Sequence, residues 1–253
     1  MFYTLAKLNF ITVGALLIIR RLNHNMSRSK RYTQLKALID PKQLYSIEEA
    51  VDLVKKTATT KFVGSVEVHM HLGVDVKQSD QQIRTTLVMP HSIGKIKRVA
   101  AFVSSDKEKD AKEAGAEVIG SQDIIDDIVK TGKIDFDVAV ATPDMMPKLA
   151  KIAKILGPRG LMPNPKTDTV GTNVKKMVED LKRGKVAIKN DATGNIHQSI
   201  GKTSLSEAEL IGNYSAVLET IRKVKPAKAK GTYIKKVVLT SSMGPAIHVE
   251  VKN

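Results

Sequence analysis

The residues of this chain that come nearest to a catalytic motif form the short run Ile200-Gly-Lys-Thr203. The run looks like the end of the phosphate-binding loop of nucleotide hydrolases, in which backbone N–H groups cradle phosphates and the lysine reaches them. That loop requires a glycine five residues before Gly201, where this chain has Ile196. The sequence also contains no G-x-G-x-x-G dinucleotide fingerprint. We therefore predict that the chain neither hydrolyses nucleotides nor needs a cofactor.

Histidines offer the second candidate chemistry, because His69 and His71 stand two residues apart in a segment that alternates as a strand does. That spacing places both side chains on one face, as two metal ligands would require. A metal site needs further ligands, and the chain has no cysteine to supply them. No Ser-His-Asp arrangement or carboxylate pair stands out either. We therefore predict no metal site and no catalytic residue.

The net charge indicates the class of partner. The chain holds 41 Lys and Arg against 26 Asp and Glu, a formal charge of +15, with a pI of about 9.8. So many positive charges repel one another in the folded state and favour binding to a polyanion. Nucleic acid is the first candidate partner and an anionic membrane surface the second. Five Phe, five Tyr and no Trp supply few stacking platforms for single strands. We therefore expect folded RNA, recognised through its shape and backbone, with His69 and His71 beside RNA or solvent.

The first 25 residues are predicted to lie outside the fold. Their apolar run, Ile11 to Ile19, is too short to span a bilayer, which takes ~20 residues. The first acidic residue of the chain is Asp40. Three interpretations stay open: a misread start with Met26 as the true first residue, an organelle targeting sequence, or a genuine tail.

Two patterns of secondary structure divide the rest of the chain. Before Pro90 and after Gly184, period-two strands and helices with capping-box spacing are typical of an α+β unit. The strands expected there are 66–72, 83–88, 185–189, 195–200, 233–240 and 246–251, and the helices follow Ser46 and Ser206. Between the two points, strands alternate with helices, which is typical of a parallel, three-layer α/β sheet. The strands expected in this segment are 98–104, 117–119 and 137–142, and its helices begin at Asp106, Gln122 and Pro143.

This order predicts an α+β split domain made of both chain ends, 26–89 and 184–253, with an inserted three-layer α/β (Rossmann-like) domain at 90–183. The two crossings, near Pro90 and Gly184, would form a double-stranded hinge. The insert holds only 17 of the basic residues but 14 of the acidic ones. Most of the excess positive charge therefore belongs to the split domain, which we expect the polyanion to contact first.

One loop of the insert is unusual. Leu156-Gly-Pro-Arg-Gly-Leu-Met-Pro-Asn-Pro-Lys166 holds two glycines, three prolines and two cations, which predicts a stiff, basic, non-helical segment. Residue chemistry leaves open whether it is a plain surface connection or a patch for RNA phosphates or a partner protein.

The same loop resembles the signature loop of the family of large-subunit ribosomal protein one, the bacterial-type stalk protein. Further stretches match that family in one order between residues 28 and 251. They are Lys61-Phe62 with Val66-Glu-Val-His69, Leu72-Gly-Val-Asp75 through Ser79-Asp-Gln-Gln-Ile-Arg84, Asp137 to Asp144, and Ser242-Met-Gly-Pro245.

The resemblance implies the split architecture and a structural role in the large ribosomal subunit, without catalysis. Family members bind a stem and loops of large-subunit ribosomal RNA and form a mobile stalk beside the tRNA exit site. They assist release of deacylated tRNA, and many bacterial members repress translation of their own messenger. The partners implied are therefore large-subunit ribosomal RNA, exit-site tRNA and, as a further candidate, the chain's own messenger RNA, with no membrane. The chain would be a monomer within a cytoplasmic ribosome, or within an organellar one if the leader is a transit peptide.

The resemblance also places RNA contacts at Lys61, Phe62, Ser65, Glu67, Lys189, Asp191, Ser242, Met243 and Gly244. The lysines can meet phosphates and the hydroxyls can bond 2′-hydroxyl groups. The carboxylates can accept from a base amine or a 2′-hydroxyl, and the glycine allows RNA backbone to approach closely. Phe62 and Met243 can supply apolar contact, although a core position for Phe62 is equally open.

The chain departs from the family pattern at a few positions. Val63-Gly64 replaces an acidic pair and Thr85 replaces a glycine. Around His91, the family's glycine-rich stretch reads Ser92-Ile93-Gly94 in this chain. Lys189 stands where arginine is common and Ser242 where threonine is usual, so charge and hydroxyl are kept. The first change bears on fine RNA specificity, and the Ser92-Ile93 change bears on the hinge.

Overall fold

The computed structural model describes residues 28–94, 97–120, 122–229 and 231–251. The predicted leader, residues 1–25, lies outside the described residues. Met1–Leu38 and Ile39–Asn253 are separate compact units, and in the first unit helix α2 (Lys30–Lys36) begins at Ser29, which caps it. None of the described helices combines the length and apolar character needed to cross a membrane.

The sheet that carries most of the predicted contact residues combines strands from distant parts of the sequence. Its order is β7-β1-β8-β9, with every neighbouring pair antiparallel. The strands are β1 (Ser65–Leu72), β7 (Asn195–Lys202), β8 (Ile234–Ser241) and β9 (Ile247–Val249). Alternate residues of β1 are fully buried, from Val66 to Leu72, as the period-two pattern predicted.

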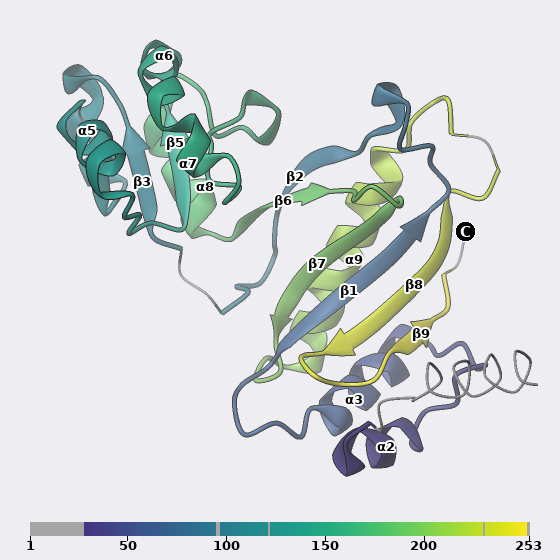
Figure 1. Ribbon diagram of the computed structural model, residues 1–253. Coiled ribbons are helices and arrows are strands. Elements are labelled where there is room, and N and C mark those ends of the chain that lie inside the picture. Colours follow the sequence, from purple (N-terminus) through teal and green to yellow (C-terminus); the bar gives the residue numbers. More distant parts are fainter. Residues whose placement is uncertain (1–27, 95–96, 121, 230, 252–253) are drawn as a thin grey trace, which may run out of the picture. The chain divides into compact units, whose positions relative to one another are not determined.

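Two helices cover the apolar face of this sheet. They are α3 (Ile47–Thr57) and α9 (Glu207–Lys223), and their buried residues share one core cluster with the strands. Figure 1 shows α9 behind the strands, whose other face is turned toward the viewer. The sheet therefore has one covered face and one open face.

Both helices begin where the capping-box spacing predicted. Glu49 N donates to Ser46 Oγ at 3.3 Å, and Ser46 N donates to Glu49 Oε2 at 3.1 Å. Ser206 and Glu209 repeat the arrangement at the start of α9. Each box satisfies backbone donors that a helix start leaves without partners, so these two predictions are confirmed.

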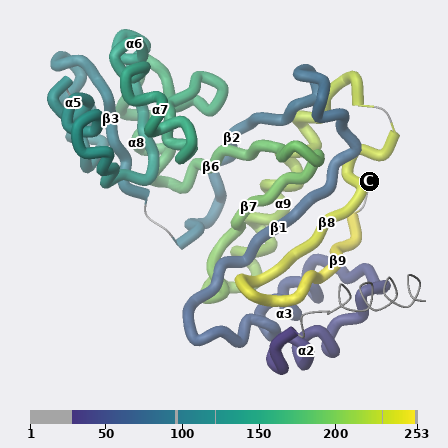
Figure 2. Tube along the Cα trace, in the orientation of Figure 1, coloured from purple at the N-terminus to yellow at the C-terminus, as the bar shows by residue number. Residues whose placement is uncertain are grey.

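A two-stranded antiparallel ribbon stands at the predicted crossings. It joins β2 (Arg84–Val88) to β6 (Lys185–Lys189), with Arg84 opposite Lys189 and Val88 opposite Lys185. Figure 2 shows the chain passing through β2 into the α/β segment and returning through β6. The division into two domains and the hinge stay predictions.

The α/β segment contains a parallel sheet with helices on both faces. Its order is β4-β3-β5, from β3 (Val99–Phe102), β4 (Val118–Gly120) and β5 (Val138–Ala141). Successive β3 residues point to opposite faces, Phe102 toward α5 (Gln122–Thr131) and Ala101 toward α4 (Glu108–Glu113) and α8 (Val174–Lys182). All four residues of β3 are buried, as strands covered on both sides should be.

The structure differs from the prediction at some boundaries. The helix expected after Pro143 is a series of short turns: 3-10 segments at Pro143–Met145 and Ala150–Ile152, with α6 (Met146–Leu149) and α7 (Ala153–Leu156). Pro147 lacks an N–H, so it fits only the first turn of a new helix, which is where it lies. The last strand is shorter than predicted, and α8 was absent from the prediction.

Candidate nucleic-acid interface

One end of the four-stranded sheet brings together predicted contact residues from both ends of the sequence. Ser65 N donates to Ser242 Oγ at 3.0 Å, and Ser242 N donates to Ser65 O at 2.9 Å. Lys202 Nζ lies 3.0 Å from Ser65 Oγ and donates to it. Lys61 and Phe62 shortly precede this junction in the chain. The loop before β1 and the turn after β8, residues 61–65 and 242–244, therefore form one surface at the ends of the strands, which we call the Ser242 edge.

Two large apolar side chains at this edge are exposed to solvent. Phe62 is 58% exposed and Met243 is 71% exposed. The alternative that Phe62 is a core aromatic is therefore wrong. Exposed apolar side chains of this size are unfavourable in water and available for contact with a ribose or a base.

The turn that presents Met243 has an unusual backbone. Met243 has a φ of 62°, in the left-handed region that non-glycine residues rarely adopt. A Cβ on Gly244 would collide with Ser241 Oγ and lie 3.2 Å from Ser241 O, so the turn itself favours glycine here. This internal requirement stands beside the predicted role of Gly244 in admitting RNA backbone. Left-handed non-glycine residues concentrate at functional sites.

Across the open face, two histidines connect the predicted contacts Glu67 and Asp191. The Nε2 atom of His69 lies 3.8 Å from Glu67 Oε2, and the Nδ1 atoms of His69 and His197 are 2.8 Å apart. The Nε2 atom of His197 lies 3.6 Å from Asp191 Oδ2. Burial, together with His197, lowers the pKa of His69, while Glu67 opposes the shift. Among the described residues, no three histidines or carboxylates are placed to share a metal ion.

Asp191 shapes the turn between β6 and β7. Its carboxylate accepts hydrogen bonds from Asn195 N at 2.7 Å and from Thr193 N at 2.8 Å. The bond from the Asn195 backbone, with those from Thr193, holds the pKa of Asp191 well below its usual range. Asp191 is therefore ionised and largely occupied by its own turn, which limits what it can offer an RNA.

The ribbon adds a cation that the resemblance did not assign. Arg84 lies directly opposite Lys189, and both are exposed. Neither makes an ion pair with another described residue, and like charges directly opposite each other on a sheet are destabilising. A phosphate between them would remove that repulsion. Sequence alone could not have found this pair, because it depends on the β2–β6 register.

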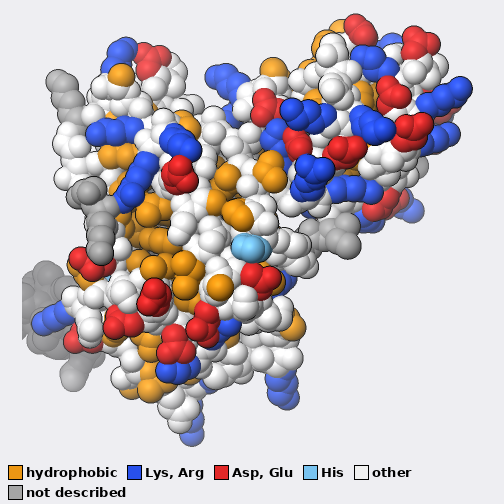
Figure 3. All heavy atoms as spheres, turned by 180° about the vertical axis from the view of Figure 1, so that it is seen from behind, with side chains coloured by type: hydrophobic (Ala, Val, Ile, Leu, Met, Phe, Trp, Pro, Cys, Tyr) orange, Lys and Arg blue, Asp and Glu red, His pale blue; other side chains and the backbone are white. Residues whose placement is uncertain are grey.

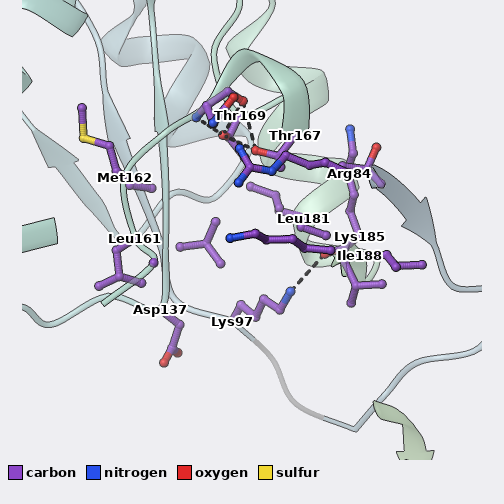
Figure 4. A pocket seen from close by; sticks show the side chains of 18 of the residues that line it. Arg84, Lys97, Asp137, Leu161, Met162, Thr167, Thr169, Leu181, Lys185 and Ile188 are labelled. Atoms are coloured by element: carbon purple, nitrogen blue, oxygen red, sulfur yellow. Dashed lines mark hydrogen bonds between the residues drawn. The ribbon is translucent and has the colours of Figure 1, made fainter. Parts of the chain in front are cut away.

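A pocket of about 390 Å³ lies where the ribbon meets the glycine- and proline-rich loop (Figure 4). Lys185 Nζ is bound to Asp168 Oδ2 at 3.0 Å, and Lys97 Nζ donates to Lys185 O at 3.0 Å. Leu161 and Met162 of the loop line the pocket and also pack against the core of the α/β segment. Part of the loop is thus structural, and two lysines of the pocket are already engaged.

The Ile200-Gly-Lys-Thr203 run is not a phosphate cradle. Gly201 and Lys202 belong to strand β7 rather than to a loop. A Cβ on Gly201 would approach Leu205 Cδ1 at 2.6 Å and Leu210 Cδ2 at 2.9 Å. Close packing explains this glycine, and the run has the backbone of a strand rather than that of a phosphate-binding loop.

The sequence model of the ribosomal protein L1p/L10e family matches residues 54–245, about three quarters of the chain. The chain belongs to this family. It is accordingly a structural constituent of the ribosome that binds ribosomal RNA of the large subunit, and the family is not one of enzymes. The matched range contains all the contact residues predicted above, from Lys61 to Gly244. Their individual roles stay predictions.

Proposed function

We propose that this chain holds a folded stem of large-subunit ribosomal RNA and so forms the mobile stalk beside the tRNA exit site. The observation that carries the proposal is the edge where Phe62 and Met243 are exposed beside the hydrogen-bonded Ser65 and Ser242. Such an edge offers apolar surface for a ribose or base and hydroxyls for the 2′-hydroxyl groups that distinguish RNA. Lys61 and Lys189 supply phosphate contacts.

The charge distribution supports RNA contact outside the α/β segment. Residues 90–183 carry 17 basic and 14 acidic side chains, so most of the net charge of +15 lies elsewhere. At the upper right of Figure 3, the basic and acidic side chains of the α/β segment are interspersed. A surface of mixed sign attracts phosphates weakly, which favours the strands of the open sheet as the RNA contact.

Movement of the α/β segment at the crossings beyond the β2–β6 ribbon would accompany release of deacylated tRNA from the exit site. The ribbon is two strands wide, and its residues Val186 and Ile188 belong to the core of the four-stranded sheet. The buried Asn213 of α9 binds both backbone groups of His91, which follows the ribbon. Bending is therefore expected beyond His91 rather than within β2.

Repression of the chain's own messenger is a second activity of the same surface. Recognition through RNA shape and backbone does not depend on which molecule carries the fold. A messenger that copies the ribosomal stem would compete for the edge formed by Lys61 and Ser242. Translation of a reporter carrying that messenger should fall when the chain is added, and addition of free stalk RNA should restore it.

The test of the RNA contact is binding to the stalk RNA, against an unrelated stem of equal length, across a salt series. We expect a preference of about a hundredfold, roughly 2.7 kcal/mol, that survives added salt. The variant with Lys61→Ala, Lys189→Ala and Ser242→Ala together should lose at least about tenfold in affinity for the stalk RNA.

A matched control carries Lys109→Ala, Lys130→Ala and Ser215→Ala, which remove the same functional groups from exposed positions elsewhere. The control should bind the stalk RNA as the wild type does. Unchanged affinity in the first variant would show that the contact residues are wrongly assigned. Equal binding of both RNAs, erased by salt, would mean a generic basic surface. Sedimentation with ribosomes separates a resident subunit from a free repressor.

A further inference from the structure

Four of the chain's six histidines gather on the open face of the four-stranded sheet. They line a hollow of about 370 Å³ together with polar neighbours: His69, His71, Asn195, His197, Lys236 and His248. In Figure 1 this face is toward the viewer, and Figure 3 shows the opposite side, where the pale blue of histidine is scarce. The hollow lies between the Ser242 edge and the Asp191 turn, the two places to which the family resemblance assigned contacts.

The fixed charges around the hollow nearly cancel. Glu67 and Asp191 are at either end of the histidine pair, Lys202 is bonded to Ser65, and Lys236 lies opposite His71 across the β1–β8 ladder. Two carboxylates therefore oppose two ammonium groups. Within the hollow itself, protonation of the imidazoles adds positive charge to nearly neutral surroundings.

Burial favours the neutral imidazole in the free protein. It lowers the pKa of His69, with a further contribution from His197, and it lowers the pKa of His248, with a further contribution from Lys236. A polyanion laid on the face would act in the opposite direction, because a nearby negative charge favours the protonated ring. Binding of an anion and uptake of protons are thus linked.

The geometry of the His69–His197 pair limits the number of protons that it can accept. The Nδ1 atoms of His69 and His197 are 2.8 Å apart, so one of them carries a hydrogen and the other accepts it. In the neutral pair, the donor ring has a bare Nε2 atom and the acceptor ring carries its hydrogen on Nε2. One proton can be added to the bare nitrogen without loss of the Nδ1–Nδ1 bond. A second would break that bond and place two cations in contact.

We propose that RNA backbone lies along this face between the Ser242 edge and the Lys189–Arg84 pair, and that the His69–His197 pair contacts a phosphate and takes up one proton from solvent on binding. The inference rests on the proposed RNA-binding function. RNA is favoured over a protein partner because four imidazoles, Asn195 and Lys236 line the hollow, which joins the two ends of one predicted RNA contact. A strand of eight residues is roughly 26 Å long, enough for several nucleotides.

One proton is transferred when the RNA binds. Solvent supplies the proton, the bare Nε2 atom accepts it, and the resulting N–H donates to a phosphate oxygen. Glu67 and Asp191 lie 3.8 Å and 3.6 Å from the two Nε2 atoms and stabilise the charged pair. Glu67 can also accept from a 2′-hydroxyl group beside the phosphate, whereas Asp191, whose carboxylate is occupied by its own turn, acts on the pair through His197.

The experiment measures affinity of the full chain for the stalk RNA between pH 6 and pH 8, with calorimetry in two buffers of different ionisation enthalpy to count protons. For the wild type we expect uptake of about one proton and an affinity that rises by up to about tenfold per pH unit as pH falls. The double variant His69→Gln, His197→Gln keeps polar side chains that cannot ionise. Its affinity should change by less than about twofold over the same range.

His91→Gln is the matched control, because His91 lies against Gly212 of α9, away from the hollow. It should keep the wild-type pH profile. Urea unfolding of each variant at both pH limits shows whether the fold is retained. The histidine inference is overturned if the affinity of the wild type for the stalk RNA does not change with pH, or if that of the double variant changes as much as the wild type's. In either case, a retained preference for the stalk RNA leaves the proposed function standing. Loss of that preference in the wild type overturns both.

Discussion

Asn213 joins three parts of the fold, and replacing it with alanine should cost more than any surface change on the same helix. Its side chain is fully buried in α9. Its Nδ2 atom donates to Ile200 O at 2.7 Å and to His91 O at 3.2 Å, and its Oδ1 atom accepts from His91 N at 3.0 Å. One amide thus connects α9 to β7 and to the segment that follows β2.

The expected magnitude follows from what each lost bond leaves behind. Ile200 is fully buried, so its carbonyl would stay without a partner, at a cost of about 1–3 kcal/mol. His91 is exposed, so water can replace the two bonds there at a cost of about 0.5–1 kcal/mol each. Alanine's better helix propensity returns roughly 0.5 kcal/mol. The net loss for Asn213→Ala should be about 1.5–4.5 kcal/mol.

Urea unfolding followed by circular dichroism measures this loss, and Ser215→Ala, at an exposed position on the same helix, is the control. The control should lie within about 0.5 kcal/mol of the wild type. Hydrogen exchange at the His91 amide should also quicken in Asn213→Ala, because that amide donates to the lost oxygen. A loss below about 1 kcal/mol with unchanged exchange at His91 would mean that water substitutes freely for the amide, and the reasoning would be refuted.

Three further outcomes are expected from urea unfolding. Gly120→Ala should destabilise the fold by about 1–3 kcal/mol, because a Cβ there would collide with the Phe102 ring. In a double-mutant cycle, Phe102→Leu should recover part of that loss. The Lys185 hydrogen bond lowers the pKa of Asp168 from 3.8, so the carboxylate stabilises the fold above that pH and less so below it. Asp168→Asn suits the same left-handed backbone and should cost at most about 1 kcal/mol at pH 7, since Asp168 is mostly exposed. Its difference from the wild type should shrink as the pH falls below 3.8. Ser206→Ala should cost about 1 kcal/mol and Ser206→Thr much less.

The sequence predicted those parts of the fold that depend on near neighbours. The Ser46 and Ser206 capping boxes were found because both partners lie within four residues. The buried strand Val138–Ala141 was found because its apolar run is continuous. Helix Val174–Lys182 carried a usable signal, an Asn173 cap followed by apolar residues at helical spacing, and could have been predicted.

The site was only partly predictable, because its geometry depends on pairings across the chain. His69 could be placed on a strand face, but its partner His197 lies 128 residues away. Arg84 opposite Lys189 likewise depends on the register of the β2–β6 ribbon. The period-two pattern fixes the face of its own strand on which each side chain lies, but it does not fix which residue of a distant strand lies opposite.

The same long-range pairings couple RNA binding to folding. The edge exists only when Ser65 meets Ser242, 177 residues later, so it is absent from any state in which β1 and β8 are apart. A ligand that binds only the closed sheet stabilises it in proportion to its affinity and concentration. Changes that weaken sheet closure will therefore lower RNA affinity without touching RNA. A true contact is recognised by the opposite behaviour: its loss reduces affinity and RNA-dependent stabilisation, while the stability of the free chain is unchanged.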